Sequence, residues 1–118
     1  MSDKPNTLFV DNNTVHWQNY SEFCRHKEWY AGWAINLNAA VNGLGYRQYD
    51  YVIIGEVLGD GESPLNFVNY IIENKIKIQT IVLTIQNFDL NNKIRQILES
   101  NYYDVIEHNG NWYSLVAQ

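Results

Sequence analysis

The sequence predicts a small three-layer α/β sandwich: a mainly parallel five-stranded sheet between helices, with a C-terminal antiparallel hairpin replacing the last helix. Three observations support this prediction. Short apolar runs alternate with segments of helical spacing through the first hundred residues, as in βαβ units. One of these runs has the continuous apolar centre of a strand that is covered on both faces. Asn109 and Gly110 lie between two alternating runs, which is typical of a tight hairpin.

The first strand is expected at residues 7–11, a β-rich apolar run that ends in an aspartate. Residues 19–29 follow, with Ser21 as a candidate N-cap. Their apolar residues fit a helical face poorly, so the pattern supports only a short helix. The first expected unit is therefore a buried strand followed by a weakly patterned helix.

The middle of the chain supplies two more strands and two helices. Residues 32–37 are the second strand candidate, and residues 38–45 form a two-turn helix that glycines bring to an end. Residues 49–59 give the strongest strand pattern of the chain. Ser63 and Pro64 mark the start of the next helix, because proline is favoured at the first helical position.

The last third of the chain repeats this alternation once before its character changes. Residues 76–85 predict the fourth strand, and Asp89 is the expected N-cap of the helix that follows. Residues 102–116 then predict the antiparallel hairpin. Since no linker, repeat or low-complexity segment divides the sequence, residues 1–118 are expected to form one domain.

Composition and charge exclude several classes of protein. The net charge of −5 argues against general nucleic-acid binding, which needs clustered lysines and arginines. A single cysteine, Cys24, excludes an internal disulfide and a multi-cysteine zinc site, and it favours a reducing compartment. The sequence lacks a membrane-spanning apolar run and a signal-peptide core, so a cytoplasmic protein without membrane association is expected.

Polar side chains follow the predicted strands at their carboxyl ends, where α/β sheets of the receiver or flavodoxin type bind ligands. Asp11, Glu56 and Asp60 are candidates for a Mg²⁺ site, because hard cations prefer carboxylates and water. In the alternative interpretation, Asp11 caps a loop and the other two are solvated turn residues. The candidate ligand-binding residues at this edge are Asp11, Asn12, Asn13, Glu56, Thr84, Gln86 and Asn87.

The three histidines give no clear catalytic pattern. His16, His26 and His108 fall on predicted loops or on a polar helix, so surface positions are expected for them. His26 and Cys24 lie two residues apart and would point to different faces of a helix. The sequence therefore does not predict a catalytic residue of its own.

Three segments resemble the cyclic-phosphate processing receiver-like domains. Residues 8–13, LFVDNN, are similar to that family's Leu-Phe-Leu-Asp-Asp opening, and residues 49–59, YDYVIIGEVLG, to its Tyr-Asp-x-Ile-Ser-Leu-Asp-His-Asp-Leu-Gly segment. Residues 81–94, IVLTIQNFDLNNKI, are similar to its Ile-x-x-His-Ser-x-Asn-Pro-x-Gly-x-x-Asn-Met segment. The resemblance covers residues 7–98 with an aromatic-rich insertion at about 17–31, and it implies a receiver-like fold.

Most of the family's polar positions are changed in this chain. Asp11, Gly59 and Asn87 match the motif. The departures are at Asn12, Thr14, Gly55, Glu56, Val57 and Thr84. A phosphate-handling enzyme of this type needs histidines for proton transfer and acidic residues for orientation or metal binding. The resemblance therefore implies a degenerate member that keeps the fold and has lost the activity.

Phosphoacceptor receivers are the other relatives that the pattern resembles. They have an acidic pair after the first strand, an aspartate at the end of the third, a threonine or serine after the fourth and a lysine after the fifth. Asp11 and Thr84 fill two of these positions, but Gly55 or Val57 stands where the phosphorylated aspartate belongs. No lysine follows the fifth strand, so phosphorelay is not expected.

Aromatic residues form the most distinctive cluster of the sequence. Tyrosine and tryptophan are common anchors of protein interfaces, because they bury large areas with few rotatable bonds. Alternatively, these side chains pack against a sheet face that the missing fifth helix leaves bare. The interface candidates are Trp17, Tyr20, Phe23, Trp29, Tyr30, Trp33, Trp112 and Tyr113.

These observations lead us to expect a catalytically inactive receiver-like domain that binds a protein partner, with a homodimer as one arrangement. Two other interpretations remain open. One is a sponge that holds a nucleotide signal without cleaving it, as in phage counter-defence. The other is a remnant phosphoesterase that uses Mg²⁺ on a cyclic phosphate. Sixteen asparagines fit AT-rich coding, which makes a phage gene and a host cytoplasm a further expectation.

Overall fold

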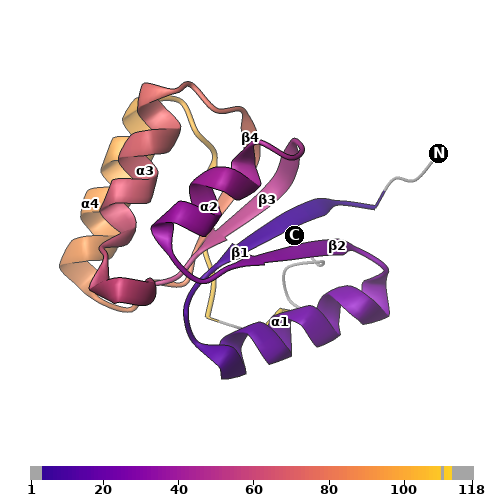
Figure 1. The fold of residues 1–118 in the computed structure, drawn as a ribbon. Coiled ribbons are helices and arrows are strands. Elements are labelled where there is room, and N and C mark those ends of the chain that lie inside the picture. The colour runs from indigo at the N-terminus through magenta and orange to yellow at the C-terminus, as the bar shows by residue number, and fades with distance from the viewer. Residues whose placement is uncertain (1–3, 110, 113–118) are drawn as a thin grey trace.

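The fold is built on a five-stranded sheet in which every strand pair is parallel (Figure 1). The computed structural model describes residues 4–109, 111 and 112, apart from the side chain of Asp60. The strand order is β2-β1-β3-β4-β5. The strands are β1 (Asn6–Val10), β2 (Tyr30–Ala34), β3 (Tyr49–Ile54), β4 (Ile78–Leu83) and β5 (Val105–Glu107). The predicted receiver-like α/β sheet is therefore confirmed.

Helices cover both faces of the sheet in unequal numbers (Figure 1). The helices are α1 (Thr14–Lys27), α2 (Leu37–Leu44), α3 (Pro64–Glu73) and α4 (Phe88–Ser100), with a short 3₁₀ turn, η1 (Gly59–Gly61), before α3. The chain moves from β1 to one edge of the sheet at β2, and then turns back through β3 to β5. Right-handed crossovers therefore put α1 on one face and the three later helices on the other.

Asparagine side chains begin three of the four described α-helices. The side-chain oxygen of each accepts a hydrogen bond from the backbone N–H three residues later, at 2.8 to 3.0 Å, in Asn13, Asn36 and Asn87. The fourth helix, α3, starts after Ser63 with Pro64 in its first turn, as predicted. Part of the asparagine bias of this sequence therefore has a local structural use.

The predicted start of the first helix was wrong. The helix begins after the N-cap Asn13, whereas Ser21 lies inside it and donates its hydroxyl to the Gln18 carbonyl. The segment 17–31 consists of α1 and the start of β2, so it belongs to the regular alternation. Its apolar pattern is weak because only three residues of the helix are buried: Tyr20, Phe23 and Cys24.

Two other boundaries differ from the predictions. The N-cap of α4 is Asn87, and the predicted cap Asp89 lies in the first turn, where a carboxylate favours the helix dipole. The second strand begins at Tyr30 and ends at Ala34, earlier than predicted. Both errors moved an element by about two residues and left the order of elements correct.

The predicted C-terminal hairpin lies partly outside the described residues, because Gly110 and residues 113–118 are among those not described. Its first arm is β5, which pairs in parallel with β4 from Val105 to Glu107. Trp112 returns to the sheet and packs at right angles on Phe9. The described part of this segment therefore completes the sheet and covers its α1 face.

Successive strand residues point to opposite faces and divide the core into two layers. We call the side chains under α2, α3 and α4 the aliphatic layer; its members include Leu8, Val10, Val52, Ile54, Leu58, Val68, Ile71, Ile81, Ile94 and Leu98. We call those under α1 the aromatic layer; it contains Phe9, Tyr20, Phe23, Cys24, Ile53, Val82 and Trp112, with Trp17, Trp29 and Tyr51 packed against them.

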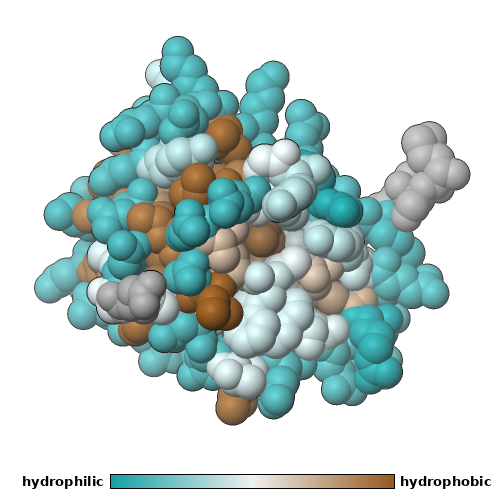
Figure 2. Space-filling model, viewed as in Figure 1, coloured by the Kyte–Doolittle hydropathy of each residue, from teal (hydrophilic) through white to brown (hydrophobic). Residues whose placement is uncertain are grey.

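Hydrophilic residues cover much of the molecular surface in the view of Figure 2, with smaller apolar areas between them. Exposed large apolar side chains are spread over several elements: Val15, Tyr30, Trp33, Ile35, Tyr46, Val57, Phe88 and Tyr102. Within the described residues, every helix is too short or too polar to cross a bilayer.

Candidate functional site

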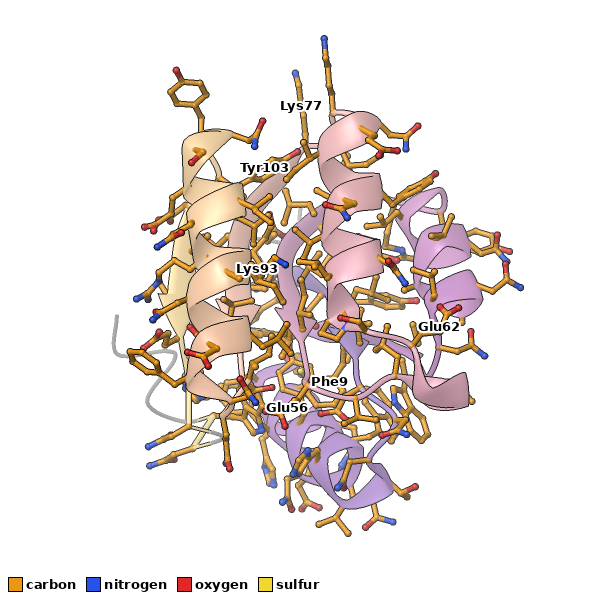
Figure 3. The ribbon with its side chains drawn as sticks, turned by 90° about the vertical axis from the view of Figure 1, so that its left-hand side faces the viewer. Phe9, Glu56, Glu62, Lys77, Lys93 and Tyr103 are labelled. Atoms are coloured by element: carbon orange, nitrogen blue, oxygen red, sulfur yellow. The ribbon has the colours of Figure 1, made fainter. Side chains whose placement is uncertain are left out.

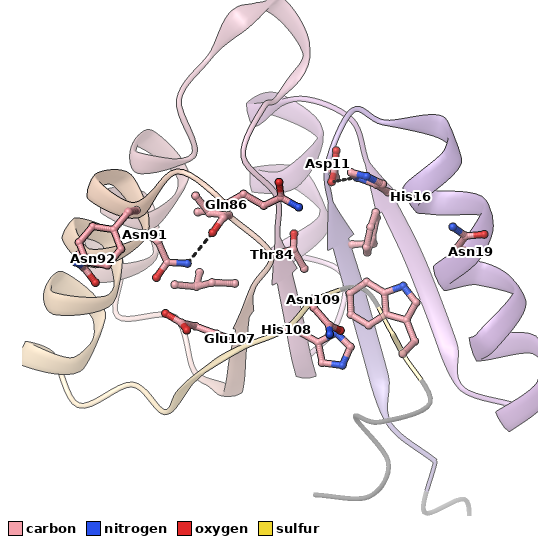
Figure 4. Close-up of a pocket in the computed structure, with 15 residues that line it drawn as sticks. Asp11, His16, Asn19, Thr84, Gln86, Asn91, Asn92, Glu107, His108 and Asn109 are labelled. Atoms are coloured by element: carbon pink, nitrogen blue, oxygen red, sulfur yellow. Dashed lines mark hydrogen bonds and ion pairs between the residues drawn. The ribbon is translucent and has the colours of Figure 1, made fainter.

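A cavity of about 740 Å³ opens at the carboxyl ends of β1, β4 and β5, between α1 and the start of α4 (Figure 4). Its volume is in the range of small-molecule sites. The polar lining residues are Asp11, His16, Asn19, Thr84, Gln86, Asn91, Asn92, Glu107, His108 and Asn109. The apolar ones are Phe9, Leu83, Ile85, Phe88 and Trp112.

Asp11 is buried directly after β1, and both of its carboxylate oxygens have partners. Oδ1 accepts a hydrogen bond from the backbone N–H of Asn13 at 2.8 Å. Oδ2 lies 3.1 Å from Nδ1 of His16, in the first turn of α1 (Figure 4). The carboxylate therefore caps the loop, as the alternative interpretation of the sequence expected. It also orients the imidazole of His16.

Gly55, directly after β3, has no room for a side chain. A Cβ built on this residue would lie 2.6 Å from Cγ of Asp11 and 2.9 Å from its Cβ, and closer still to Oδ2. Contacts this short are repulsive, so a larger residue would have to displace the Asp11 side chain. The carboxylate of Asp11 therefore fills the space above the end of β3.

Glu56 connects two loops at the edge of the sheet. Its Oε1 accepts hydrogen bonds from the backbone N–H groups of Gln86 and Asn87, at 2.9 and 2.8 Å. The residue lies close to the N-terminal end of α4 (Figure 3). This carboxylate oxygen is therefore committed to fixing the β4–α4 loop.

The structure gives no support for the predicted Mg²⁺ site. Asp11 and Glu56 use their oxygens in separate hydrogen bonds, and the side chain of Asp60 lies outside the described residues. In the described part of the chain, no three His, Cys, Asp or Glu side chains form a group that could hold a metal ion. Because the side chain of one of the three predicted ligands is not described, the Mg²⁺ site stays a prediction.

Three of the seven predicted ligand residues line the cavity: Asp11, Thr84 and Gln86. The hydroxyl of Thr84 donates a long hydrogen bond of 3.4 Å to the Ile54 carbonyl. Asn13 and Asn87 are helix caps, so their side-chain oxygens are already used. The other four predicted ligand residues do not line the cavity: Asn12, Asn13, Glu56 and Asn87.

The remaining polar lining comes from the helices and from the end of β5, which the sequence did not predict as site residues. His16 and Asn19 extend from α1, and Asn91 and Asn92 from α4. Asn91 and Asn92 lie two and three residues after the expected Asp89 cap, so a helical wheel of α4 was a usable signal for them. No comparable signal pointed to Asn19, because the start of α1 was misplaced.

The end of β5 contributes one ion pair and one stacked pair of rings. Glu107 accepts from Arg95 of α4 at 3.1 Å. The His108 ring stacks on Trp112, with centroids 4.6 Å apart and an interplanar angle of 4°. Burial lowers the pKa of His108, since a desolvated imidazole resists protonation. Burial therefore favours the neutral form of this imidazole.

The predicted aromatic interface is mostly core. Tyr20, Phe23 and Trp112 are buried, and Trp17 and Trp29 are half-buried. For these five residues the packing interpretation is correct, because they cover the sheet face that carries one helix. Two candidates stay exposed, Tyr30 and Trp33, at 42% and 37% of their surface. Tyr113 lies outside the described residues.

No family model matches this sequence. No curated protein matches it either. Many solved structures share its fold, and three bacterial ones illustrate the likeness. They are a response regulator receiver protein from Pseudomonas putida, a two-component response regulator from Clostridium difficile, and a response regulator from Burkholderia pseudomallei with a phosphorylated aspartic acid, a calcium ion and citrate.

These likenesses extend over the whole chain at low sequence identity. The Pseudomonas protein has a TM-score of 0.74 and 16% identity, with 99% of this chain and 96% of the other covered. The Clostridium protein has a TM-score of 0.71 and 20% identity, with 97% of this chain and 91% of the other covered. The Burkholderia protein has a TM-score of 0.72 and 16% identity. The match covers 98% of this chain, which spans 65% of the length of the Burkholderia protein. The chain therefore has the receiver fold.

Proposed function

We propose that this chain is a receiver-like regulatory module that is switched by a bound ligand and not by phosphorylation at the end of β3. One observation carries the proposal: Asp11 fills the space in which a side chain at residue 55 would have to lie. A phosphoacceptor receiver needs an aspartate at this strand end, and the Burkholderia protein contains a phosphorylated aspartic acid. Gly55 has neither the carboxylate nor the room for one.

The lost acceptor site lies beside a cavity that can take its place as the point of input. The cavity has the volume of a small-molecule site and combines aromatic walls with amide and hydroxyl groups. We propose that a small polar ligand binds there without being cleaved. The proposed binding requires no metal ion or other cofactor.

The output of such a module is proposed to be a change in affinity for a partner protein. Tyr30 and Trp33 are the aromatic candidates that remain exposed for this contact, at the edge strand β2. A second copy of the chain is one partner that fits, because β2 has an unpaired edge in the described sheet. We further propose a cytoplasmic location, in a host cell if the gene belongs to a phage. We also propose that the chain shares ancestry with the cyclic-phosphate processing domains that three of its segments resemble, and that it does not share their activity.

The first test addresses phosphorylation. We expect acetyl phosphate with Mg²⁺ to leave the intact mass of the protein unchanged, because Gly55 offers no acceptor. The Pseudomonas receiver protein, treated in parallel, is the positive control. An acid-stable or acid-labile phosphoryl adduct on this chain would contradict the proposal.

The second test addresses ligand binding. We expect a thermal-shift screen of small polar metabolites to yield a ligand that raises the melting temperature and is recovered intact by mass spectrometry. Asn92→Ala in the cavity wall should reduce the shift, whereas Asn66→Ala, exposed on α3, should not. Recovery of a hydrolysed ligand would show an enzyme and overturn the proposed inactivity. Failure of the whole screen to shift the melting temperature would overturn ligand input.

A further inference from the structure

The first property of the cavity that restricts its ligand is charge. It is lined by the carboxylates of Asp11 and Glu107, and its described lining contains no lysine or arginine. Arg95 pairs with Glu107 but is not part of the lining. Phosphate binding in proteins depends mainly on lysine or arginine side chains or on free backbone N–H groups, and the imidazole of His16 in the lining is already paired with Asp11. The side chains of this cavity therefore do not favour a phosphate group.

Several backbone N–H groups at the helix N-termini beside the cavity are also occupied. At α1, the N–H groups of Asn13 and His16 bond to Asp11 and to the Asn13 side chain. At α4, the N–H groups of Gln86 and Asn87 bond to Glu56. These are the donors that usually hold an anion at the end of a parallel strand. The protein therefore satisfies them with its own oxygens.

The second property is the number of amides. Five side chains of the lining carry one: Asn19, Gln86, Asn91, Asn92 and Asn109. A free amide has two N–H donors and a carbonyl acceptor. Asn91 Nδ2 and Asn109 Oδ1 already have partners within the protein, and the other amide groups still match a ligand that has donors and acceptors on one edge. Amides of this kind also recognise the edges of adenine bases.

Asn91 is the buried member of this set of amides. Its Nδ2 donates to the Ile85 carbonyl at 2.9 Å, which fixes the amide orientation (Figure 4). Its Oδ1 is buried and has no hydrogen-bond partner in the described structure. A buried acceptor without a partner is costly, but this oxygen has almost no accessible surface, so a ligand reaches it only if the Asn91 amide turns toward the cavity.

The third property is aromatic. The rings of Phe9, Phe88, His108 and Trp112 line the cavity. Phe9 and Trp112 are buried, and the His108 ring stacks on Trp112. Phe88 at the start of α4 is 75% exposed, so its ring is the accessible aromatic surface of the lining. An accessible aromatic face can bind a planar ring by stacking.

From these three properties we infer that the cavity binds an uncharged planar heterocycle of the nucleobase or nucleoside class and discriminates against its phosphorylated forms. The inference rests on the proposed ligand-binding function and names its ligand class. The amides read the polar edge of the ring and the exposed ring of Phe88 stacks on its face. The described lining has two carboxylates and no lysine or arginine, which disfavours the phosphate.

Calorimetric titration with matched probes tests the inference. The probes are adenine, guanine, cytosine, uracil, their ribonucleosides and the corresponding 5′-monophosphates. At least one base or nucleoside should bind. The affinity for its 5′-monophosphate should be lower by about tenfold or more, because the phosphate meets carboxylates. Phe88→Ala should weaken binding by about tenfold through lost stacking. Tyr102→Ala, which removes an aromatic residue that is 98% exposed and outside the cavity lining, is the matched control and should have no effect.

The alternative outcomes separate this inference from the proposed function. Tighter binding of the monophosphates, or full affinity in Phe88→Ala, would overturn the ligand class while ligand input stands. Binding of none of these probes, together with a hit of other chemistry in the thermal-shift screen, would do the same. If nothing binds in either experiment, both proposals fail.

Discussion

The two layers of the core solve the same packing problem with different side chains. The aliphatic layer is covered by α2, α3 and α4, whereas the aromatic layer is covered by α1 and by Trp112 from the end of the chain. Phe9 stacks on Tyr20 with ring centroids 4.9 Å apart, and Trp112 meets the Tyr20 ring edge-on at 4.7 Å. With fewer elements available, the α1 side uses larger side chains.

Within the described residues, the comparison shows how one helix and aromatic side chains can cover a sheet face. An aromatic side chain buries 150 to 250 Å², roughly, and aromatic pairs add about 0.5–1.5 kcal/mol beyond this burial. Half-buried rings extend the cover toward the edge strand, where Trp17 stacks on Trp33 at 5.1 Å. Rings therefore supply the area that a helix supplies on the other face.

The largest expected effect compares neighbouring residues of β1 that point into different layers. Phe9→Ala should lower the free energy of unfolding by about 3–5 kcal/mol, through lost burial and lost ring contacts. Leu8→Ala in the aliphatic layer should cost about 2–4 kcal/mol. Urea denaturation of both variants measures the difference. A larger loss for Leu8→Ala would reverse the comparison.

Trp112 tests whether the chain end truly replaces a helix. Trp112→Ala should cost about 3 kcal/mol, because the ring is buried against Phe9 and Tyr20. Trp29→Ala is the matched control and should cost less, since that ring is half-buried beside Tyr51. Chemical denaturation measures the loss of stability in each variant, and binding of a hydrophobic dye reports exposed apolar surface. Equal losses of stability would mean that Trp112 stabilises the α1 face no more than Trp29 does.

The smallest effect at neutral pH concerns the Tyr20 hydroxyl. Burial raises the pKa of Tyr20 above its ordinary value of 10.0, so the folded state keeps a proton that the unfolded state releases above that pH. Stability is therefore unaffected below about pH 10 and falls as the pH rises further, by up to about 1.4 kcal/mol per pH unit. Tyr20→Phe should reduce this slope and change stability by less than about 1.5 kcal/mol at pH 7.

Tyr103 of the aliphatic layer provides the matched variant for this pH dependence. Burial also raises its pKa, but the residue is less buried than Tyr20, and its hydroxyl donates to the Ile76 carbonyl. Tyr103→Phe should therefore reduce the alkaline slope by less than Tyr20→Phe. Denaturation curves between about pH 9 and 11 provide the measurement. An alkaline slope that neither variant changes would assign it to other groups, such as Cys24.

The sheet and the order of its elements were predictable, because buried parallel strands are short, continuous apolar runs. The strands around Val52 and Ile81 gave such runs, and Ser63 with Pro64 marked α3 correctly. The start of α1 was not predictable in this way. Its buried face is narrow and aromatic, and the capping asparagine, Asn13, is one of sixteen in the chain.

The candidate site was predictable only where it is made by strand ends. Asp11 and Thr84 follow strands whose ends were clear, and both line the cavity. The amides of Asn19 and Asn91 reach it from helices, and their orientation depends on how each helix packs. Glu56 looked like a ligand from its position, yet it bonds to the backbone of the neighbouring loop. Sequence position does not distinguish these two uses of a carboxylate.

The contact between Asp11 and Gly55 also restricts how this sequence can change over evolutionary time. An aspartate at residue 55 requires the Asp11 side chain to turn away, because in its present conformation both would occupy the same volume. Such a rotation disturbs the hydrogen bond from the Asn13 backbone N–H that caps the α1 loop. A substitution at residue 55 therefore carries a stability cost at a second residue, which makes the two positions interdependent.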